Sequence, residues 1–250
     1  MICLNFSFIT DCGIRRPTNE DYCYADTLEI QGEDIGFFVV ADGMGGHKKG
    51  EVASKLAVDE LKNYVLDYFK ENNQEQIDLK MLLSRAFYET NKTVYKQAFD
   101  NEKFTGMGTT LIAAIINSNN LVVGNVGDSR AYVFRDGNLY QLTVDNSYVQ
   151  ELIEQGIIKP EDAKVHPQKN IITRAIGTDK SVRVDFYHKE LQKNDLVLLC
   201  SDGLTNMVDD IEIQNTLRMS KDANLCCEKL VELANSKGGK DNITVVCVIL

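Results

Sequence analysis

Apolar and polar residues change their spacing once within the first hundred positions. Alternation over 2–10, a short run over 22–26 and a continuous apolar run over 36–41 predict strands, the last of them buried on both faces. From Gly50 onward apolar residues recur every three or four positions, and helical spacing continues over 78–99. This part of the chain is therefore predicted to form strands followed by two amphipathic helices.

Strand patterns return in the middle and at the end of the chain. They cover residues 109–116, 121–127, 131–134, 139–142, 182–188, 196–200 and 244–249. The Asp136-Gly137 turn between two of these runs is typical of a tight β-hairpin. Further helices are predicted at 146–155, 211–217 and 223–233. Residues 157–180 show no clear period, which indicates a loop or flap.

Strands and helices each cluster along the chain, without regular alternation of one strand and one helix. This order favours an α+β fold with antiparallel sheets over a doubly wound parallel sheet. The sequence has only three prolines, and we find no internal repeat and no linker in it. We therefore expect one domain over residues 1–250, with a flap at about 146–180.

Composition and charge exclude several classes of protein. Hydrophobic residues make up 44% and charged residues 26%, as in a soluble globular protein with a sizeable core. The net charge of −10 repels phosphate backbones and anionic lipids, so nucleic acid and membrane surfaces are not expected as partners. No stretch approaches the roughly 20 apolar residues of a membrane helix. Residues 1–10 lack the features of a signal peptide.

The seven cysteines are scattered along the chain, at positions 3, 12, 23, 200, 226, 227 and 247. No C-x-x-C pair occurs, which argues against a zinc ribbon and a thioredoxin-like site. Several cysteines lie in apolar, strand-like runs, where this residue usually acts as a small core hydrophobe. We expect a reduced, cytoplasmic protein.

Familiar phosphate-binding and nucleophile motifs do not fit the sequence. The glycine-rich segment 42–50 matches neither the Walker loop nor the dinucleotide-binding pattern. A G-x-S-x-G elbow is missing, and three histidines leave little room for a His-rich zinc site.

Aspartates instead mark the ends of the most apolar runs. These are Asp42, Asp128, Asp202 and Asp241, joined by Asn19-Glu20-Asp21 before another strand. Carboxylates at buried strand ends need a cation or a hydrogen-bonding partner. Taken singly, each Asp-Gly is a plain turn and Glu20 belongs to a solvated loop. The regular placement of the whole set favours a divalent-metal site, and all-oxygen ligands favour Mg²⁺ or Mn²⁺ over zinc.

The aspartates belong to motifs that together resemble one family. The motifs are R-x-x-N-E-D at 16–21, V-A-D-G-M-G-G at 40–46, G-T-T at 108–110, V-G-D-S-R at 126–130, ELIEQGII…HP…N…ITRAIGT over 151–178, S-D-G-L at 201–204 and D-N-I-T at 241–244. In this order they resemble the metal-dependent protein phosphatases of the type-2C family, in the short bacterial form. Each motif alone is weak, whereas the ordered set covers nearly the whole chain.

The resemblance implies a fold and an activity. The fold is a four-layer α-β-β-α sandwich with two mostly antiparallel sheets flanked by helix pairs. The activity is hydrolysis of phosphoserine and phosphothreonine in proteins by a metal-bridging hydroxide, without a covalent phosphoenzyme. Such an enzyme would reverse Ser/Thr kinase signalling, so its expected partners include a kinase and the targets of that kinase. We expect a monomer.

The resemblance also implies the metal ligands. Asp42 matches the carboxylate that bridges two metal ions, and the backbone carbonyl of Gly43 matches a ligand of one of them. Asp202 and Asp241 match the remaining carboxylates on the other ion. Two Mn²⁺ or Mg²⁺ ions are therefore expected in the core site.

Four further residues complete the implied site. Glu20 and Asp21 match positions that hold metal-bound waters or complete the shell of the second ion. Asp128 resembles the aspartate that, with Asp202, holds a third and weaker ion. Arg16 matches the phosphate-binding arginine, a role that suits a planar guanidinium with two donors on one edge.

Two departures from the family pattern concern proton delivery and the flap. Met44 stands where many relatives carry a histidine proposed as the general acid, and it has no proton to donate. The proton donor is therefore open between His47 and a water on the third metal, of which we favour the water. In the flap, Asn146 stands where the family pattern has a histidine between Asp145 and Ser147.

Three alternatives stay open at this point. A non-catalytic phosphoprotein-binding module would be expected to have lost a metal carboxylate, and none is missing. A Ca²⁺-binding domain is disfavoured because residues 179–190 fail the EF-hand pattern. The third alternative keeps the phosphatase but gives it an anti-sigma antagonist as substrate instead of kinase targets, and the sequence does not separate these roles.

Overall fold

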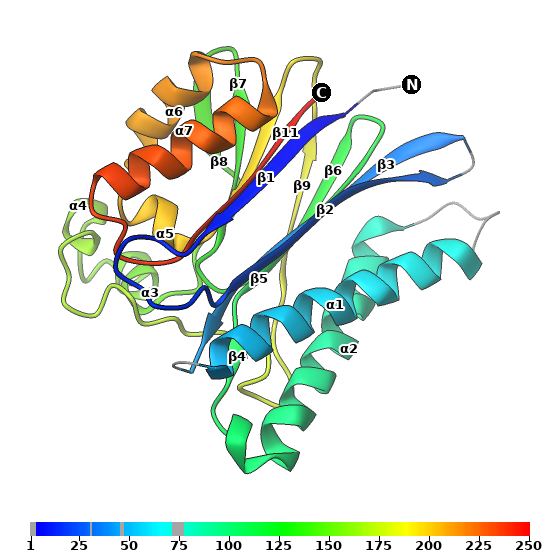
Figure 1. The fold of residues 1–250 in the computed structure, drawn as a ribbon, viewed down its shortest axis with the longest axis vertical. Helices are drawn as coiled ribbons and strands as arrows, with labels where there is room; N and C mark the ends of the chain where they lie inside the picture. Colours follow the sequence, from blue (N-terminus) through cyan, green and yellow to red (C-terminus); the bar gives the residue numbers. More distant parts are fainter. Residues whose placement is uncertain (1–3, 31, 46–47, 72–77) are drawn as a thin grey trace.

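The computed structural model describes residues 4–30, 32–45, 48–71 and 78–250. Two β-sheets pack face to face, and helices cover the outer face of each (Figure 1). The paired strands in this part of the chain are antiparallel. The predicted α+β class and the α-β-β-α layering are confirmed.

The first sheet joins the two ends of the chain. Its order is β1 (Asn5–Asp11), β11 (Ile243–Ile249), β10 (Leu196–Cys200), β7 (Arg130–Arg135) and β8 (Asn138–Gln141). Strands β7 and β8 form the predicted hairpin. At its turn Asp136 and Gly137 have φ of 51° and 79°, the left-handed backbone that a two-residue hairpin turn requires.

The second sheet is built from the first half of the chain and one later strand. Its order is β2 (Asp21–Ile30), β3 (Glu33–Met44), β5 (Leu111–Asn117), β6 (Asn120–Val126) and β9 (Asp185–Glu190), with β4 (Gly108–Thr109) paired to the end of β3. Strand β2 is longer than the predicted run 22–26. Its second half mixes the exposed Asp26 and Glu29 with half-buried residues without regular alternation, which obscures the strand in the sequence.

Two helix pairs form the outer layers. Helices α1 (Lys48–Glu71) and α2 (Leu79–Asp100) pack on each other, and α1 lies on β2 and β3. Helices α6 (Asp210–Arg218) and α7 (Ala223–Ser236) pack on the first sheet, with α7 on β1 and β11. The 3.6-residue spacing predicted these four helices because each buries one apolar stripe.

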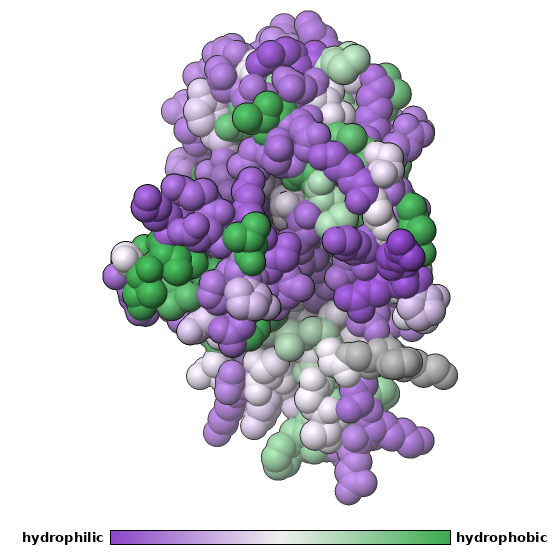
Figure 2. All heavy atoms as spheres, turned by 90° about the vertical axis from the view of Figure 1, so that its left-hand side faces the viewer, coloured by the Kyte–Doolittle hydropathy of each residue, from purple (hydrophilic) through white to green (hydrophobic). Residues whose placement is uncertain are grey.

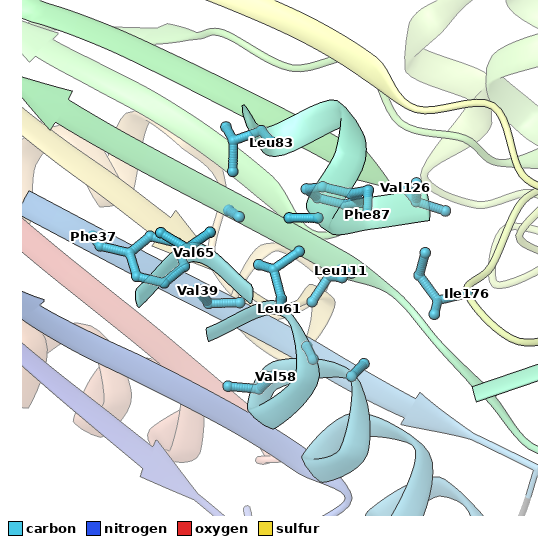
Figure 3. Packing of buried hydrophobic residues seen from close by; sticks show 14 of the residues in the cluster. Phe37, Val39, Val58, Leu61, Val65, Leu83, Phe87, Leu111, Val126 and Ile176 are labelled. Atoms are coloured by element: carbon cyan, nitrogen blue, oxygen red, sulfur yellow. The ribbon is translucent and has the colours of Figure 1, made fainter. Parts of the chain in front are cut away.

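The continuous apolar run in β3 has a clear structural reason. Phe37 and Val39 face the helices, where they pack in one cluster with Leu61 and Phe87 (Figure 3). Phe38 faces the other way, into the cluster between the two sheets. A strand buried on both faces has no polar side to alternate with.

Short helices were not visible in the sequence pattern. They are η1 (Glu102–Phe104), α4 (Pro160–Ala163) and α5 (Asp202–Thr205). Each is too short to show a helical period. Helix α3 (Tyr148–Glu154) begins later than predicted, because Ser147 is its N-cap and accepts a hydrogen bond from the backbone N–H of Gln150.

The predicted flap lies between β8 and β9 and contains α3 and α4. Figure 2 shows the face of the molecule to which these helices belong as largely hydrophilic, with small apolar areas. Ile157, Val165 and Ile171 of the flap have exposed apolar side chains. In the described part of the chain, no helix combines the length and apolar character needed to cross a bilayer.

Candidate metal centre

Seven of the eight predicted site residues line one cavity of about 280 Å³. They are Arg16, Glu20, Asp42, Gly43, Asp128, Asp202 and Asp241. The eighth, Asp21, is buried directly beside Asp42 in the neighbouring strand. The structure thus brings together the whole set that the motifs indicated.

Antiparallel pairing explains why these residues meet. The start of β2 lies beside the end of β3, so Asp21 is opposite Asp42. The end of β10 lies beside the start of β11, and Asp202 and Asp241 stand just outside these strands. Asp128 follows the end of β6. Carboxylates from both sheets therefore converge at one end of the sandwich.

The backbone of Asp42 is fixed by the G-T-T motif. Its N–H donates to Oγ1 of Thr110 at 2.9 Å, and its carbonyl accepts from the N–H of Thr110 at 2.9 Å. The hydroxyl of Thr109 donates to the same carbonyl at 2.8 Å. Burial raises the pKa of the Asp42 carboxyl well above its usual value, and the charge of Asp21 raises it further.

Asp21 is held by two hydroxyl groups. Ser201 and Thr244 each donate a hydrogen bond of 2.7 Å to its Oδ2. Its Oδ1 is buried without a hydrogen-bond partner among the described residues. Burial raises the pKa of Asp21 to about 7, although the two hydroxyls stabilise the charged form.

Asp202, like Asp21, has one hydrogen-bonded and one unpartnered carboxylate oxygen. Its Oδ2 accepts a hydrogen bond of 2.8 Å from Nδ2 of Asn206, one turn further along the chain. Its Oδ1 is buried and has no partner in the described structure. Burial, followed by the charge of Asp241, raises the pKa of Asp202 to about 6, and burial raises that of Asp128 to about 8.

These observations fit a site for hard divalent cations. A buried carboxylate oxygen without a partner is costly, and a cation removes that cost. The donors in the cavity are carboxylate and carbonyl oxygens, which Mg²⁺ and Mn²⁺ prefer. Within the described ranges, no three His, Cys, Asp or Glu side chains already form a ligand group for one ion.

Arg16 reaches the cavity from an irregular loop. Its Nη2 donates to Oδ2 of Asp241 at 2.7 Å, and about half of the Arg16 side chain is exposed. This hydrogen bond raises the pKa of Arg16, which is charged at any ordinary pH. The guanidinium lines the cavity and is partly open to solvent.

Asn242 is a site residue that the sequence analysis did not identify. Its Nδ2 donates to the carbonyls of Cys12 and Thr18, both at 2.9 Å, and its Oδ1 accepts from the N–H of Glu20 at 2.8 Å. These bonds enclose the loop that carries Arg16. The D-N-I-T motif contained the residue, but only the fold shows that its partners lie more than 200 positions away.

Gly43 satisfies a strict packing requirement. A Cβ at this position would lie 2.1 Å from the backbone carbonyl oxygen of Gly50. The N–H of Gly43 donates to the carbonyl of Glu20 at 3.1 Å, and this carbonyl also accepts from Ser54 at 2.5 Å. A side chain at Gly43 would therefore force the end of β3 away from α1.

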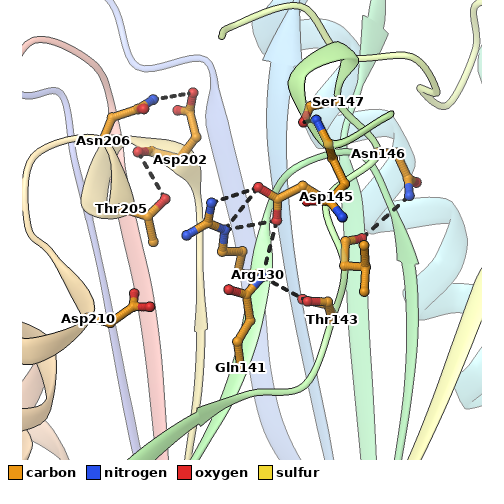
Figure 4. A network of polar contacts seen from close by, with 12 residues as sticks. Arg130, Gln141, Thr143, Asp145, Asn146, Ser147, Asp202, Thr205, Asn206 and Asp210 are labelled. Atoms are coloured by element: carbon orange, nitrogen blue, oxygen red, sulfur yellow. Dashed lines mark hydrogen bonds and ion pairs between the residues drawn. The ribbon is translucent and has the colours of Figure 1, made fainter. Parts of the chain in front are cut away.

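A second polar network lines a neighbouring pocket, which shares Asp128 and Asp202 with the cavity (Figure 4). Arg130 donates to Asp145 through Nε and Nη2, with distances of 2.7–3.1 Å. The resulting ion pair ties β7 to the residues that enter the flap. The flap also contributes Asn170 and Ile172 to the wall of the cavity. The sequence analysis did not assign these residues to the site.

Of the residues discussed for proton donation, the structure describes only position 44. Met44 lines the cavity, so a thioether stands where many relatives are expected to carry an imidazole. The alternative donor, His47, lies outside the described residues.

Comparison with known proteins agrees with this geometry. A sequence model of the family described as protein phosphatase 2C matches residues 15–223. The serine/threonine phosphatase stp of Listeria welshimeri is 40% identical over 247 residues, which cover 98% of this chain and 95% of the relative.

Solved structures are similar over the same extent. The crystal structure of the serine/threonine phosphatase Stp1 from Staphylococcus aureus has a TM-score of 0.90 at 40% identity, and covers 100% of this chain and 96% of its own. The catalytic domain of the phosphatase PstP, crystallised with two manganese ions, has a TM-score of 0.84 at 35% identity and covers 99% of both chains.

The carboxylate cluster predicts an unusual pH dependence of stability. The folded-state pKa values of Asp21, Asp42, Asp128 and Asp202 are all raised, so the folded chain binds more protons than the unfolded chain at intermediate pH. Without divalent cations, the free energy of unfolding should therefore fall as pH rises from about 5.5 to 8.5, by about 1.4 kcal/mol per pH unit for each group protonated only in the folded state.

Thermal unfolding in EDTA at several pH values measures this effect. Asp42→Asn should flatten the profile and raise the melting temperature at the high end of the range. Asp67→Asn, at an exposed site on α1, is the control and should leave the slope unchanged. A chelated wild-type protein whose stability rises steadily over this range would contradict the assignment.

Proposed function

This chain belongs to the protein phosphatase 2C family, and we propose that its carboxylate cavity binds two Mn²⁺ or Mg²⁺ ions for hydrolysis of phosphoserine and phosphothreonine in proteins. The observation that carries the proposal is a pair of buried, unpartnered carboxylate oxygens, one of Asp202 in the wall of the acidic cavity and one of Asp21 beside Asp42. The family relationship makes the chain a metal-dependent serine/threonine protein phosphatase. Mn²⁺ is the ion in the PstP structure.

Each carboxylate has a distinct place in this proposal. Asp42 lies near the end of β3 and would contact both ions, with the backbone carbonyl of Gly43 on one of them. Asp202 and Asp241 would hold the other ion. Asp21 and Glu20 would hold water around the ions or complete their ligand shell.

The reaction needs a nucleophile, a held phosphoryl group and a protonated leaving group. When bound, the two cations lower the pKa of water toward neutrality and so supply hydroxide. Arg16 donates two hydrogen bonds to phosphoryl oxygens and offsets their charge in the transition state. Its pairing with Asp241 holds the guanidinium at the cavity mouth until substrate arrives. We found no nucleophilic Cys or Ser motif, in agreement with direct attack by water.

Asp128 extends the proposal to a third, weaker cation. It lies on the boundary between the catalytic cavity and the pocket behind it, and Asp202 lines both spaces as well. The two carboxylates would share this ion. Because Met44 has no proton to give, water held at this position is our preferred proton donor for the serine or threonine alkoxide.

The physiological substrates are phosphoproteins, and we propose that they include a Ser/Thr kinase and the targets of that kinase. An anti-sigma antagonist is the alternative substrate class. We further propose a cytoplasmic monomer that uses neither nucleic acid nor membrane as a partner, in keeping with its net charge of −10. A non-catalytic binding module is disfavoured because every expected carboxylate lies at the cavity.

Hydrolysis of a phosphothreonine peptide tests the function directly. Phosphate release should require millimolar Mn²⁺ or Mg²⁺, stop in excess EDTA and survive thiol-blocking reagents. Asp42→Asn should lower kcat by at least about 1,000-fold, since the group that positions the nucleophile is lost. Asp67→Asn should keep wild-type turnover. Full activity in EDTA, or one tenth of wild-type turnover in Asp42→Asn, would contradict the proposal.

Arg16→Ala tests phosphate binding. Its main effect should be a rise in KM for the phosphopeptide of about tenfold or more, with a smaller fall in kcat, because Arg16 contacts the phosphate before and during the reaction. Arg16→Lys keeps the charge but loses the planar pair of donors, so it should recover only part of the loss. An unchanged kcat/KM in Arg16→Ala would assign this residue to the solvated surface.

Asp128→Ala tests the third ion by a binding measurement. Electron paramagnetic resonance of free Mn²⁺ should show three binding sites in the wild type, one of them weaker, and two in the variant. Turnover of the phosphopeptide should fall more than turnover of p-nitrophenyl phosphate, whose leaving group needs little protonation. If wild type and Asp128→Ala gave identical Mn²⁺ binding curves, the proposal of a third ion at Asp128 would be wrong.

A further inference from the structure

Asn146 is the point at which the flap sequence departs from the family pattern, and it is buried at the base of the flap. Its exposed fraction is 3%. The flap base comprises residues 145–147, where the chain enters the flap, and 171–174, where it leaves. Backbone N–H of Tyr148 donates to the carbonyl of Ile171 at 2.8 Å just above this base.

Asn146 uses its backbone and its side chain to join three separate elements. Its backbone N–H donates to the carbonyl of Gly127 at 2.8 Å, and its carbonyl accepts from the N–H of Thr173 at 2.8 Å. Its side-chain Oδ1 accepts from the N–H of Gly127 at 3.0 Å. Its Nδ2 donates to Oδ2 of Asp185 on β9 at 3.0 Å.

Each of these contacts bears on the catalytic cavity. Gly127 directly precedes Asp128, and Thr173 directly follows Ile172, which lines the cavity together with Asn170. Asp185 is anchored in turn by Arg174, at 2.7 Å, as the chain leaves the flap. The Asn146 side chain therefore connects the loop that carries Asp128 with Asp185 and, through Asp185, with Arg174 at the flap base. The backbone carbonyl of Asn146 adds the link to Thr173.

We propose that Asn146 is a positioning residue that holds the flap wall in register with the Asp128 loop and thereby sets the affinity for phosphopeptides. The inference rests on the proposed phosphatase function. An amide supplies one acceptor to Gly127 and one donor to Asp185, and a neutral imidazole also has one donor and one acceptor. This equivalence explains how asparagine serves at a position where the family pattern has histidine.

Asn146→Ala removes both side-chain bonds and leaves the buried N–H of Gly127 without its acceptor. The KM for a phosphothreonine peptide should rise about tenfold, because the flap residues that face the peptide lose their fixed position. For p-nitrophenyl phosphate, which is too small to need the flap, kcat/KM should change by less than about threefold. Brief trypsin digestion should cut faster at the flap lysines 164 and 169.

Exchange of the two partners provides a rescue experiment. Asn146→Asp alone places two carboxylates side by side, and Asp185→Asn alone leaves two amides in contact. The double variant Asn146→Asp/Asp185→Asn restores one donor and one acceptor in reversed order, and Gly127 keeps its acceptor, but the ion pair of Arg174 with position 185 is lost. We therefore expect the folded double variant to resist protease better than Asn146→Asp and to have a lower peptide KM, without reaching wild type.

Gln214→Ala is the matched control. Gln214 on α6 is a half-buried amide outside the flap, and its Oε1 accepts from the backbone N–H of Leu139 at 3.0 Å. Its loss should lower the melting temperature without changing flap cleavage or the ratio of peptide to aryl phosphate activity. A purely structural role for Asn146 would give the same result in Asn146→Ala.

The inference is overturned if Asn146→Ala behaves like Gln214→Ala, if both substrates lose activity equally, or if the folded double variant is no better than Asn146→Asp. Should Asn146→Ala not fold, Asn146→Ser undergoes the same three measurements. A wild-type protein that hydrolyses neither substrate would refute the proposed function, while the protease and rescue data would still decide whether Asn146 fixes the flap.

Discussion

Repulsion between carboxylates that the fold forces together is the constraint on which the rest of this structure depends. Asp21 and Asp42 come from one sheet and Asp202 and Asp241 from the other, and burial raises the pKa of the first three. Two sheets packed through a continuous apolar layer hold these groups in place against their own repulsion. With a weaker core, the two sheets would separate where the carboxylates converge, and the repulsion would fall. Here the sheets stay packed, and bound cations would neutralise the charges instead.

The supporting groups around the acids are mostly neutral. Hydroxyls of Ser201 and Thr244 fix Asp21, the amide of Asn206 fixes Asp202, and Thr110 fixes the backbone of Asp42. Neutral donors orient a carboxylate without cancelling its charge, so the negative potential that attracts divalent cations is kept. These donors contact only one carboxylate oxygen of Asp21 and one of Asp202. The other oxygen of each, Oδ1, has no partner among the described residues.

Two buried asparagines connect this centre to the loop of Arg16 and to the flap. Asn242 holds the loop of Arg16, and Asn146 holds the base of the flap. An amide is suited to both places because it donates and accepts at once and stays neutral beside the acids. The Arg16 loop and the flap show no helical or strand period in the sequence. Both are nevertheless fixed by a few hydrogen bonds close to the cavity.

The sequence by itself determined the long helices, most strands, the class of fold and the set of acids, because apolar periodicity and strand-end aspartates are local signals. Its motifs also carried the resemblance that the comparisons bear out. Tertiary structure alone decided the roles of Asn242, Asn146 and Arg130, and the existence of α5. The hydrogen bonds of Asp21 with Thr244 and of Glu20 with Asn242 join residues more than 200 positions apart, and no local pattern encodes which distant backbone group a buried side chain will meet.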